Sequence, residues 1–293
     1  LRSRQRRVTR KDHSIFPDSS SWRIFDFSML CRSVRNVMMK RQFSVTMAVA
    51  IFLLSASFAQ DDSHEGAYHK NLKYTGPVTG DEILYTLYLP RSHRKGAGTY
   101  PLVIFLHGAG GGNSSFEVMQ SYEAARQSGL IGDAIFLFPE KYGGTAWRDG
   151  VKGKNAETNV LRELLPYLEK EYGATSDREQ RTIMGFSMGA AGSIFWGGKY
   201  PEIFSTVVAL DAGGGNSVSD PTMRNYIPEY IENTETIRSS VKIRLVQGGL
   251  NTKNFQETLK ELAIPFDLEY LPNAASDYLE NSCCLNKKDP SKK

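Results

Sequence analysis

The chain alternates short apolar runs with longer stretches in which apolar residues recur every three or four positions. Residues 102–106 and 134–138 are continuous apolar runs, which is typical of strands buried on both faces. Residues 155–172 carry apolar side chains at helical spacing, and Gly173 follows where such a helix would end. This alternation predicts an α/β fold, with a mostly parallel central sheet and helices on both of its faces.

The other elements continue the same order. A half-exposed strand is expected over 83–89, where Pro90 ends it. Further strands are expected over 181–185, 204–210, 242–246 and 266–271, and helices over 116–127, 188–200 and 255–262. Pro166 should kink the helix expected over 155–172 or move its boundary. The pattern weakens over 213–240, which we interpret as a cap over the sheet.

The first 59 residues differ from the rest of the chain in charge and in pattern. They hold 11 Lys and Arg against 3 Asp and Glu, whereas the remainder holds 25 basic and 29 acidic residues. Lys40-Arg41 precedes an apolar run over 45–54, and small residues follow at 57–59. This order is typical of a secretory signal peptide, and the run is short for a membrane span. We therefore expect a signal peptide at about 38–59 and a secreted or periplasmic protein, with an uncleaved anchor as the alternative.

The expected organisation has one large domain. We divide the chain into an N-terminal extension with the signal peptide (1–59), a linker (60–75), an α/β domain (76–280) and a polar tail (281–293). The mildly acidic domain argues against a nucleic-acid partner, so membrane contact is expected only through the signal segment. No spacing of Cys and His predicts a metal site, and we expect no cofactor.

The segment Gly185-Phe186-Ser187-Met188-Gly189 matches the Gly-x-Ser-x-Gly pattern of a nucleophile elbow. An apolar strand precedes this segment and a helix rich in Gly and Ala follows it. The pattern needs glycines on both sides because the serine occupies a strained turn in which side chains would clash. We interpret Ser187 as a candidate nucleophile, with a plain tight turn as the alternative.

A second glycine-rich motif follows the buried strand at 102–106 and reads His107-Gly108-Ala109-Gly110-Gly111-Gly112. In hydrolases such a loop directs one backbone N–H toward the nucleophile, and the residue after the serine supplies another. The expected oxyanion donors are thus the N–H groups of Ala109 and Met188. Gly108 and Gly110 would shape the loop, and His107 would pack beneath it as a hydrogen-bonding support. A phosphate-binding loop is the alternative, but the Walker spacing with its lysine is absent.

Together these motifs resemble the putative-esterase branch of the α/β-hydrolases, which includes feruloyl esterases, tributyrin-type esterases and S-formylglutathione hydrolase. The resemblance also rests on Trp147 in a loop, Glu157-Thr158-Asn159 at the start of a helix, and Tyr200-Pro201-Glu202-Ile203-Phe204 after the elbow helix. It covers residues 76–280 approximately. It implies an α/β-hydrolase fold and acyl transfer on small carboxylic esters, carbohydrate-linked esters included, through Ser187.

The chain departs from this family at two of the three triad positions. In the family an acid closely follows a strand that ends in glycine, and here Asn251 holds that place after Gly248-Gly249. The family histidine follows the last strand, and here Ser276 holds its place, four residues after Pro272. No histidine follows Ser187 in the 293 residues, because all five precede it.

Loss of the triad histidine lowers turnover about 10⁶-fold and leaves roughly 10³ to 10⁴ over water from the oxyanion hole and binding. The replacement bases that the sequence offers are His69, His107, Lys199, Lys253 and Asp277. We therefore expect a serine hydrolase of the esterase type with impaired turnover. The alternative is a catalytically inactive relative that binds ester or carbohydrate ligands.

Overall fold

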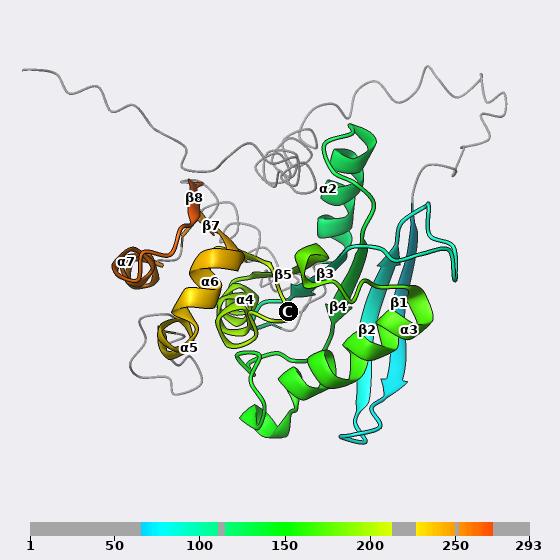
Figure 1. Cartoon of the computed structure of the whole chain (residues 1–293). Helices are drawn as coiled ribbons and strands as arrows, with labels where there is room; N and C mark the ends of the chain where they lie inside the picture. The colour runs from blue at the N-terminus through cyan, green and yellow to red at the C-terminus, as the bar shows by residue number, and fades with distance from the viewer. Residues whose placement is uncertain (1–65, 111–114, 213–226, 250–251, 272–293) are drawn as a thin grey trace, which may run out of the picture.

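A computed structural model of the chain describes residues 66–110, 115–212, 227–249 and 252–271 (Figure 1). These residues form an eight-stranded sheet in the order β1-β2-β4-β3-β5-β6-β7-β8. β1 and β2 pair antiparallel, as do β2 and β4, whereas all pairs from β4 to β8 are parallel. No helix among the described residues is long and apolar enough to cross a membrane. The expected signal peptide and polar tail lie outside these residues.

The strands are β1 Ala67–Thr75, β2 Glu82–Leu89, β3 Leu102–Leu106, β4 Ile135–Pro139, β5 Arg181–Phe186, β6 Thr206–Leu210, β7 Lys242–Gln247 and β8 Asp267–Tyr270. The α-helices are α2 Ser115–Gln127, α3 Leu165–Tyr172, α4 Met188–Lys199, α5 Ile227–Glu232, α6 Thr234–Ser240 and α7 Lys253–Glu261. A π-helical segment, η5 Thr158–Leu164, leads directly into α3, and short 3₁₀ turns occupy η4 Val151–Gly153 and η6 Arg178–Gln180.

This architecture confirms the predicted fold class. The strand expected over 102–106 begins and ends where the sequence predicts. The other predicted strands and helices differ from the observed ones by at most two residues at either end, apart from the helix expected over 155–172. Continuous apolar runs were reliable here because the central strands are covered on both sides.

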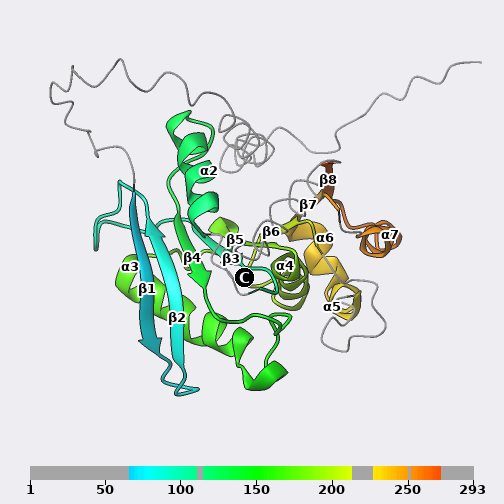
Figure 2. The ribbon, with the colours of Figure 1, turned by 180° about the vertical axis from the view of Figure 1, so that it is seen from behind.

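Alternate residues of β3 pack on opposite faces of the sheet. Leu102, Ile104 and Leu106 belong to the buried cluster that includes side chains of α3 and α4. Val103 and Phe105 belong to the cluster that includes side chains of α2. Figure 2 shows α2 apart from α3 and α4, with the sheet between them. Both faces of the strand are therefore removed from water, which explains why its sequence shows no alternation.

β1 lies in the segment for which we expected a linker over 60–75, so the sheet begins before residue 76. It pairs antiparallel with β2 at one edge of the sheet. Leu72 and Tyr74 of this strand pack against the cluster that includes α3 and α4, and Tyr68 packs against the cluster that includes α2. His69, Lys70 and Lys73 give the strand a polar, solvated character. An edge strand with so few apolar residues leaves a weak pattern in the sequence.

The helix expected over 155–172 is divided close to Pro166, as the sequence predicts. Pro166 lies in the first turn of α3, directly after the π-helical η5, so its missing N–H coincides with the change from π-helix to α-helix. In η5, the buried Glu163 carboxylate accepts hydrogen bonds from the backbone N–H groups of Val78 (3.3 Å) and Thr79 (2.7 Å). The segment before the proline therefore anchors the turn between β1 and β2.

The described part of the region interpreted as a cap forms the short helices α5 and α6, while 213–226 lies outside the described residues. Tyr230 of α5 and Ile237 of α6 are fully buried in the same cluster as α4 side chains. These helices pack beside α4 (Figure 1). Helices of six and seven residues are too short to produce a clear periodic pattern.

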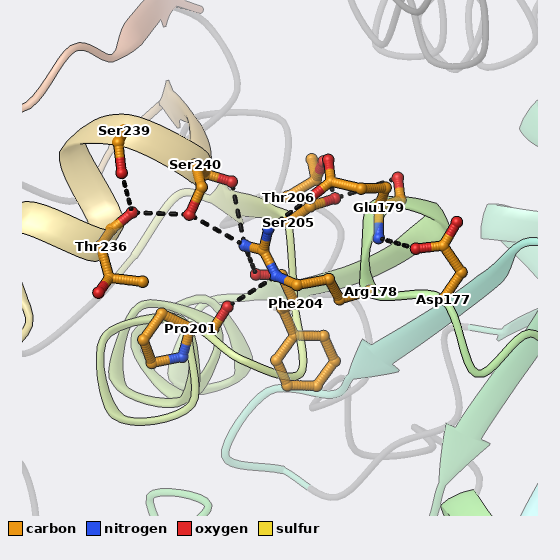
Figure 3. Close-up of polar contacts among 10 residues, drawn as sticks. All are labelled: Asp177, Arg178, Glu179, Pro201, Phe204, Ser205, Thr206, Thr236, Ser239 and Ser240. Atoms are coloured by element: carbon orange, nitrogen blue, oxygen red, sulfur yellow. Dashed lines mark hydrogen bonds and ion pairs between the residues drawn. The ribbon is translucent and has the colours of Figure 1, made fainter.

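Arg178 joins three chain segments near the N-terminal ends of β6 and β7 (Figure 3). Its Nε donates a hydrogen bond to the Pro201 carbonyl at 3.0 Å. One of its terminal nitrogens donates to the carbonyls of Phe204 (3.1 Å) and Ser240 (3.0 Å). Phe204 precedes β6 and Ser240 precedes β7, so one guanidinium holds the starts of two neighbouring strands together.

We predict that Arg178→Met lowers the free energy of unfolding by about 1.5–3 kcal/mol, because three carbonyls lose a charged donor. Urea unfolding followed by circular dichroism measures this change. The control is Arg162→Met, since Arg162 is exposed on η5. Equal stability of the two variants would contradict a structural role for the Arg178 guanidinium.

Candidate active site

Ser187 lies in the turn between β5 and α4, as the sequence predicts. Its backbone has φ 54° and ψ −115°, a conformation that residues other than glycine rarely adopt. Its N–H donates to the Leu210 carbonyl at 3.0 Å, and its own carbonyl accepts from the Ala191 N–H at 3.1 Å. The Ser187 side chain forms no capping hydrogen bond with α4. The hydroxyl is therefore held at a strained turn without being used to cap the helix.

The glycines of the motif are required by close backbone contacts. A Cβ on Gly185 would lie 2.3 Å from the Gly189 carbonyl oxygen. A Cβ on Gly189 would lie 1.9 Å from the Leu106 carbonyl oxygen at the end of β3. Both distances are far shorter than van der Waals contact. The start of α4 therefore crosses the ends of β5 and β3 at a separation that only glycine permits.

This crossing brings the second motif to the serine. Gly108 is the second residue after β3, and a Cβ built on it would lie 3.6 Å from the Ser187 Cβ. Ala109 and Gly110 follow as exposed residues in a turn, whereas 111–114 lies outside the described residues. The glycine-rich loop thus begins directly beside the candidate nucleophile.

His107 supports the start of this loop. Its side chain is buried, its Nδ1–H donates to the Gly108 carbonyl at 2.7 Å, and its Nε2 accepts from the Tyr142 N–H at 3.3 Å. Burial lowers the pKa of His107 below its usual value, so the neutral imidazole that these bonds require is favoured. These two hydrogen bonds connect the start of the loop to Tyr142, while the role of His107 as a support remains a prediction. Since both ring nitrogens bond to backbone groups, His107 is not placed to serve as the base for Ser187.

Trp147 ties the same loop to the elbow helix. Its indole N–H donates to the His107 carbonyl at 3.1 Å, and its own carbonyl accepts from the Trp196 indole N–H at 2.8 Å. A Cβ on Gly192 would lie 2.6 Å from the Trp147 ring, so α4 packs directly on it. The side chain is fully buried. Trp147 therefore fixes the first residue of the loop relative to the helix that follows Ser187.

Glu157, part of the segment before η5, connects this region to the far end of α4. Its buried carboxylate accepts hydrogen bonds from Lys199 (2.6 Å) and from the Tyr200 hydroxyl (2.7 Å). Burial, together with the hydrogen bond to Glu157, raises the pKa of Tyr200 to about 12. The tyrosine therefore stays protonated and donates to the carboxylate at neutral pH. Motif residues that are far apart in sequence thus form one structural network around α4.

Met188 is the first residue of α4, a helix of 12 residues. The first N–H groups of a helix have no partner within it, and the helix dipole favours negative charge there. Its backbone N–H follows directly on Ser187, while its side chain is buried. The helix start next to the serine is therefore suited to stabilise an oxyanion, which is the role expected for Met188 together with Ala109.

Two replacement bases suggested by the sequence, His69 and Lys199, are poorly placed for Ser187. His69 is exposed on β1, four strand positions from β5, a separation of about 19 Å. Lys199 lies at the opposite end of α4, roughly 17 Å along the helix axis, and is paired with Glu157. Lys253 is exposed at the start of α7 and lies 3.8 Å from Glu257.

The expected acid and histidine positions, Asn251 and Ser276, lie outside the described residues, as does Asp277. The strands that lead to the first two positions are described. β7 ends at Gln247 and pairs parallel with β6, and β8 ends at Tyr270 and pairs parallel with β7. The chain therefore leaves both strands at the same edge of the sheet as Ser187. Among the described residues, no group of three or more His, Cys, Asp or Glu could hold a metal ion.

Asp211, the first residue after β6, is a site residue that the sequence motifs do not predict. Its carboxylate accepts hydrogen bonds from the N–H groups of Gly248 (2.9 Å) and Gly249 (3.2 Å), which follow β7. Its backbone also has a positive φ, 50°. The sequence signal for Asp211 is an aspartate at the carboxyl end of an apolar strand. The resemblance to the esterase family places the expected acid after β7 instead.

We predict that Gly189→Ala destabilises the fold by about 1–3 kcal/mol or more, because the new methyl group would overlap the Leu106 carbonyl. Gly110→Ala is the matched control, since no atom of the described residues, apart from its chain neighbours, lies within 4 Å of a Cβ at that position. Thermal unfolding of both variants measures the difference. Similar melting temperatures for the two would show that α4 does not cross β3 as closely as described.

Comparison with known proteins agrees with this geometry. A family model described as "Putative esterase" matches residues 76–254. Chlorophyllase type 0 of Chenopodium album is 26% identical over 164 residues, which cover 53% of this chain and 46% of that protein. The chain spans less than half the length of the curated relatives it matches.

Two solved structures share the fold at low sequence identity. A ferulic acid esterase has a TM-score of 0.59 at 22% identity, with 71% of this chain and 90% of that chain covered. The substrate-bound structure of FphF, a fluorophosphonate-binding serine hydrolase of Staphylococcus aureus, has a TM-score of 0.60 at 17% identity. It is matched over its whole length by 77% of this chain. The eight-stranded sheet, the serine elbow and the family match lead to one conclusion: the chain belongs to the putative-esterase family of carboxylesterase-like proteins with the α/β-hydrolase fold.

Proposed function

We propose that this chain is an exported serine hydrolase-like protein that acts on small carboxylic esters through Ser187. The position of Ser187 carries this proposal: a strained turn at the start of α4 with Gly108 of the glycine-rich loop beside it. The solved relatives named as a ferulic acid esterase and a fluorophosphonate-binding serine hydrolase support the same chemistry. An ester of an aromatic acid, carbohydrate-linked or free, is the substrate class we favour.

The proposed reaction is acyl transfer. The Ser187 Oγ attacks the ester carbonyl carbon, its proton passes to a base, and the carbonyl π electrons move to the oxygen. The N–H groups of Ala109 and Met188 would stabilise the resulting oxyanion. Collapse of this intermediate breaks the bond to the alcohol, which leaves with a proton. Water then attacks the acyl-serine and releases the acid and the free serine.

Removal of the serine proton is the reaction step that this protein is least equipped to catalyse. Asn251 and Ser276, at the acid and histidine positions, carry no charge and no basic nitrogen lone pair at neutral pH. His107 is engaged by backbone groups, and the other described candidates are remote from Ser187 or exposed in an ion pair. Without any of these groups as base the proton would pass to water, for which a neutral hydroxyl is a poor donor. We therefore propose that turnover is low even though the elbow is formed.

One observation favours a second function. All histidines of the 293 residues precede the elbow, so the site resembles that of an esterase without its base. Such a site would still bind an ester or carbohydrate ligand and would release it unchanged. The chain would then act as a binding protein that uses the esterase fold.

We predict that the wild-type protein hydrolyses p-nitrophenyl acetate and butyrate slowly, and that Ser187→Ala changes this rate little. The double variant Asn251→Asp/Ser276→His should raise turnover by about 10³-fold or more, because these residues supply the orienting acid and the base. Adding Ser187→Ala to the double variant is the control and should abolish the gain.

Three other results would change this account. Rapid wild-type hydrolysis that Ser187→Ala abolishes would show that another group serves as base. A folded double variant without any gain would mean that Asn251 and Ser276 do not face Ser187. Calorimetric binding of methyl ferulate by Ser187→Ala, without hydrolysis by the wild type, would favour the binding function.

Export follows from the N-terminal pattern and is tested separately. We predict that the secreted protein begins near Gln60 or Asp61, because small residues at 57–59 follow the apolar run. N-terminal sequencing of protein from the medium or periplasm measures this. A mature chain that retains residues 38–59 would favour an uncleaved anchor instead.

A further inference from the structure

Asp211 and Ser187 occupy equivalent positions on neighbouring parallel strands. β5 and β6 pair in a register that ends with Phe186 opposite Leu210, so each is the first residue after its strand. Both have a positive φ, 54° for Ser187 and 50° for Asp211. A positive φ is costly for a side-chain-bearing residue and persists only where surrounding contacts impose it.

A single peptide group joins the two strand ends. The carbonyl of Leu210 accepts the Ser187 N–H at 3.0 Å. The N–H of the same peptide group belongs to Asp211 and donates to the Val246 carbonyl of β7 at 2.6 Å. This peptide group therefore connects the backbone of the candidate nucleophile to the end of β7, and its orientation determines where the Ser187 N–H points.

The Asp211 side chain fixes the orientation of that peptide group. One carboxylate oxygen accepts from the Gly248 N–H at 2.9 Å and the other from the Gly249 N–H at 3.2 Å. Hydrogen bonds from backbone N–H groups to a charged carboxylate are among the stronger ones in proteins. With the side chain held on the β7 side, rotation about the Asp211 backbone would break either these bonds or the bond to Val246.

We propose that Asp211 is a positioning residue for Ser187. By holding the turn after β7 through its carboxylate, it keeps the Leu210–Asp211 peptide group in the orientation that receives the Ser187 N–H. This constraint maintains the strained φ of the serine and the direction of the Met188 N–H that follows it. The inference rests on the proposed function of Ser187 as a nucleophile.

A set of substitutions separates the carboxylate from the backbone conformation. Asp211→Asn keeps a residue that tolerates positive φ and loses one of the two acceptors. Asp211→Gly accepts positive φ without strain but has no side chain to hold Gly248 and Gly249. Asp211→Ala lacks both the carboxylate and the conformational freedom. Arg178→Met is the matched control, because Arg178 joins β6 and β7 at their opposite ends.

The first measurement is the second-order rate constant for labelling of Ser187 by a fluorophosphonate probe, with the labelled residue identified by mass spectrometry. Small misplacements of a reacting group can cost as much as roughly 100-fold in rate. We expect about a tenfold loss in Asp211→Asn and a loss of about 10- to 100-fold in both Asp211→Gly and Asp211→Ala. Arg178→Met should stay within about twofold of wild type at a temperature where all variants are folded.

The second measurement is amide hydrogen exchange of the peptides that contain Ser187 and Gly248-Gly249. It does not depend on the reactivity of the serine. We expect faster exchange of the Ser187 amide in Asp211→Gly than in Arg178→Met. Weak or absent labelling of wild-type Ser187 agrees with the low turnover proposed above, and the exchange comparison, which does not depend on the proposed function, then decides the role of Asp211.

Three outcomes would overturn the role of Asp211. The first is wild-type labelling in Asp211→Gly combined with slow labelling in Asp211→Ala, which would assign the effect to backbone strain alone. The second is an equal loss of labelling in Arg178→Met, which would indicate general destabilisation of β6 and β7. The third is an unchanged Ser187 amide exchange rate in every Asp211 variant.

Discussion

The close crossing of α4 over the end of β3 is the constraint on which the rest of the site depends. Gly189 lies so near the Leu106 carbonyl that no side chain fits between them. A helix that begins at this distance must leave β5 through a sharp turn, and Ser187 occupies that turn with a positive φ. The same proximity brings Gly108 beside the serine. The candidate nucleophile and the start of the glycine-rich loop thus meet because of one backbone contact.

Residues for which we propose no part in the chemical step support this crossing through hydrogen bonds and packing. Trp147 holds the His107 carbonyl and packs against α4, while His107 holds the start of the loop through two backbone bonds. On the other side of β5, the Leu210–Asp211 peptide group joins the serine to β7. The elbow is therefore held on both sides by hydrogen bonds that involve no catalytic base. Its geometry can therefore persist whatever residues hold the acid and histidine positions, at which we expect Asn251 and Ser276.

Much of the fold could be predicted from the sequence, for identifiable physical reasons. Strands such as β3 are buried on both faces, so their apolar runs are unambiguous. β1 was missed because an edge strand needs few apolar residues. The motifs around Ser187 and His107 were recognisable because glycine is required where backbones nearly touch. Asp211 was not, because an aspartate at a strand end becomes informative only when the sheet order shows which turn it faces.

Backbone strain at the end of a strand must be balanced by contacts from the neighbouring strands. The order of strands in the sheet determines which strands are available for this. β5 has β3 on one side and β6 on the other. β3 leads into Gly108, which lies beside Ser187. β6 contributes Asp211, whose bonds extend to β7. The site is therefore a property of four adjacent strand ends rather than of the elbow motif alone. A chain can retain that arrangement whatever residue it carries at the expected histidine position, because that position follows β8, outside these four strands.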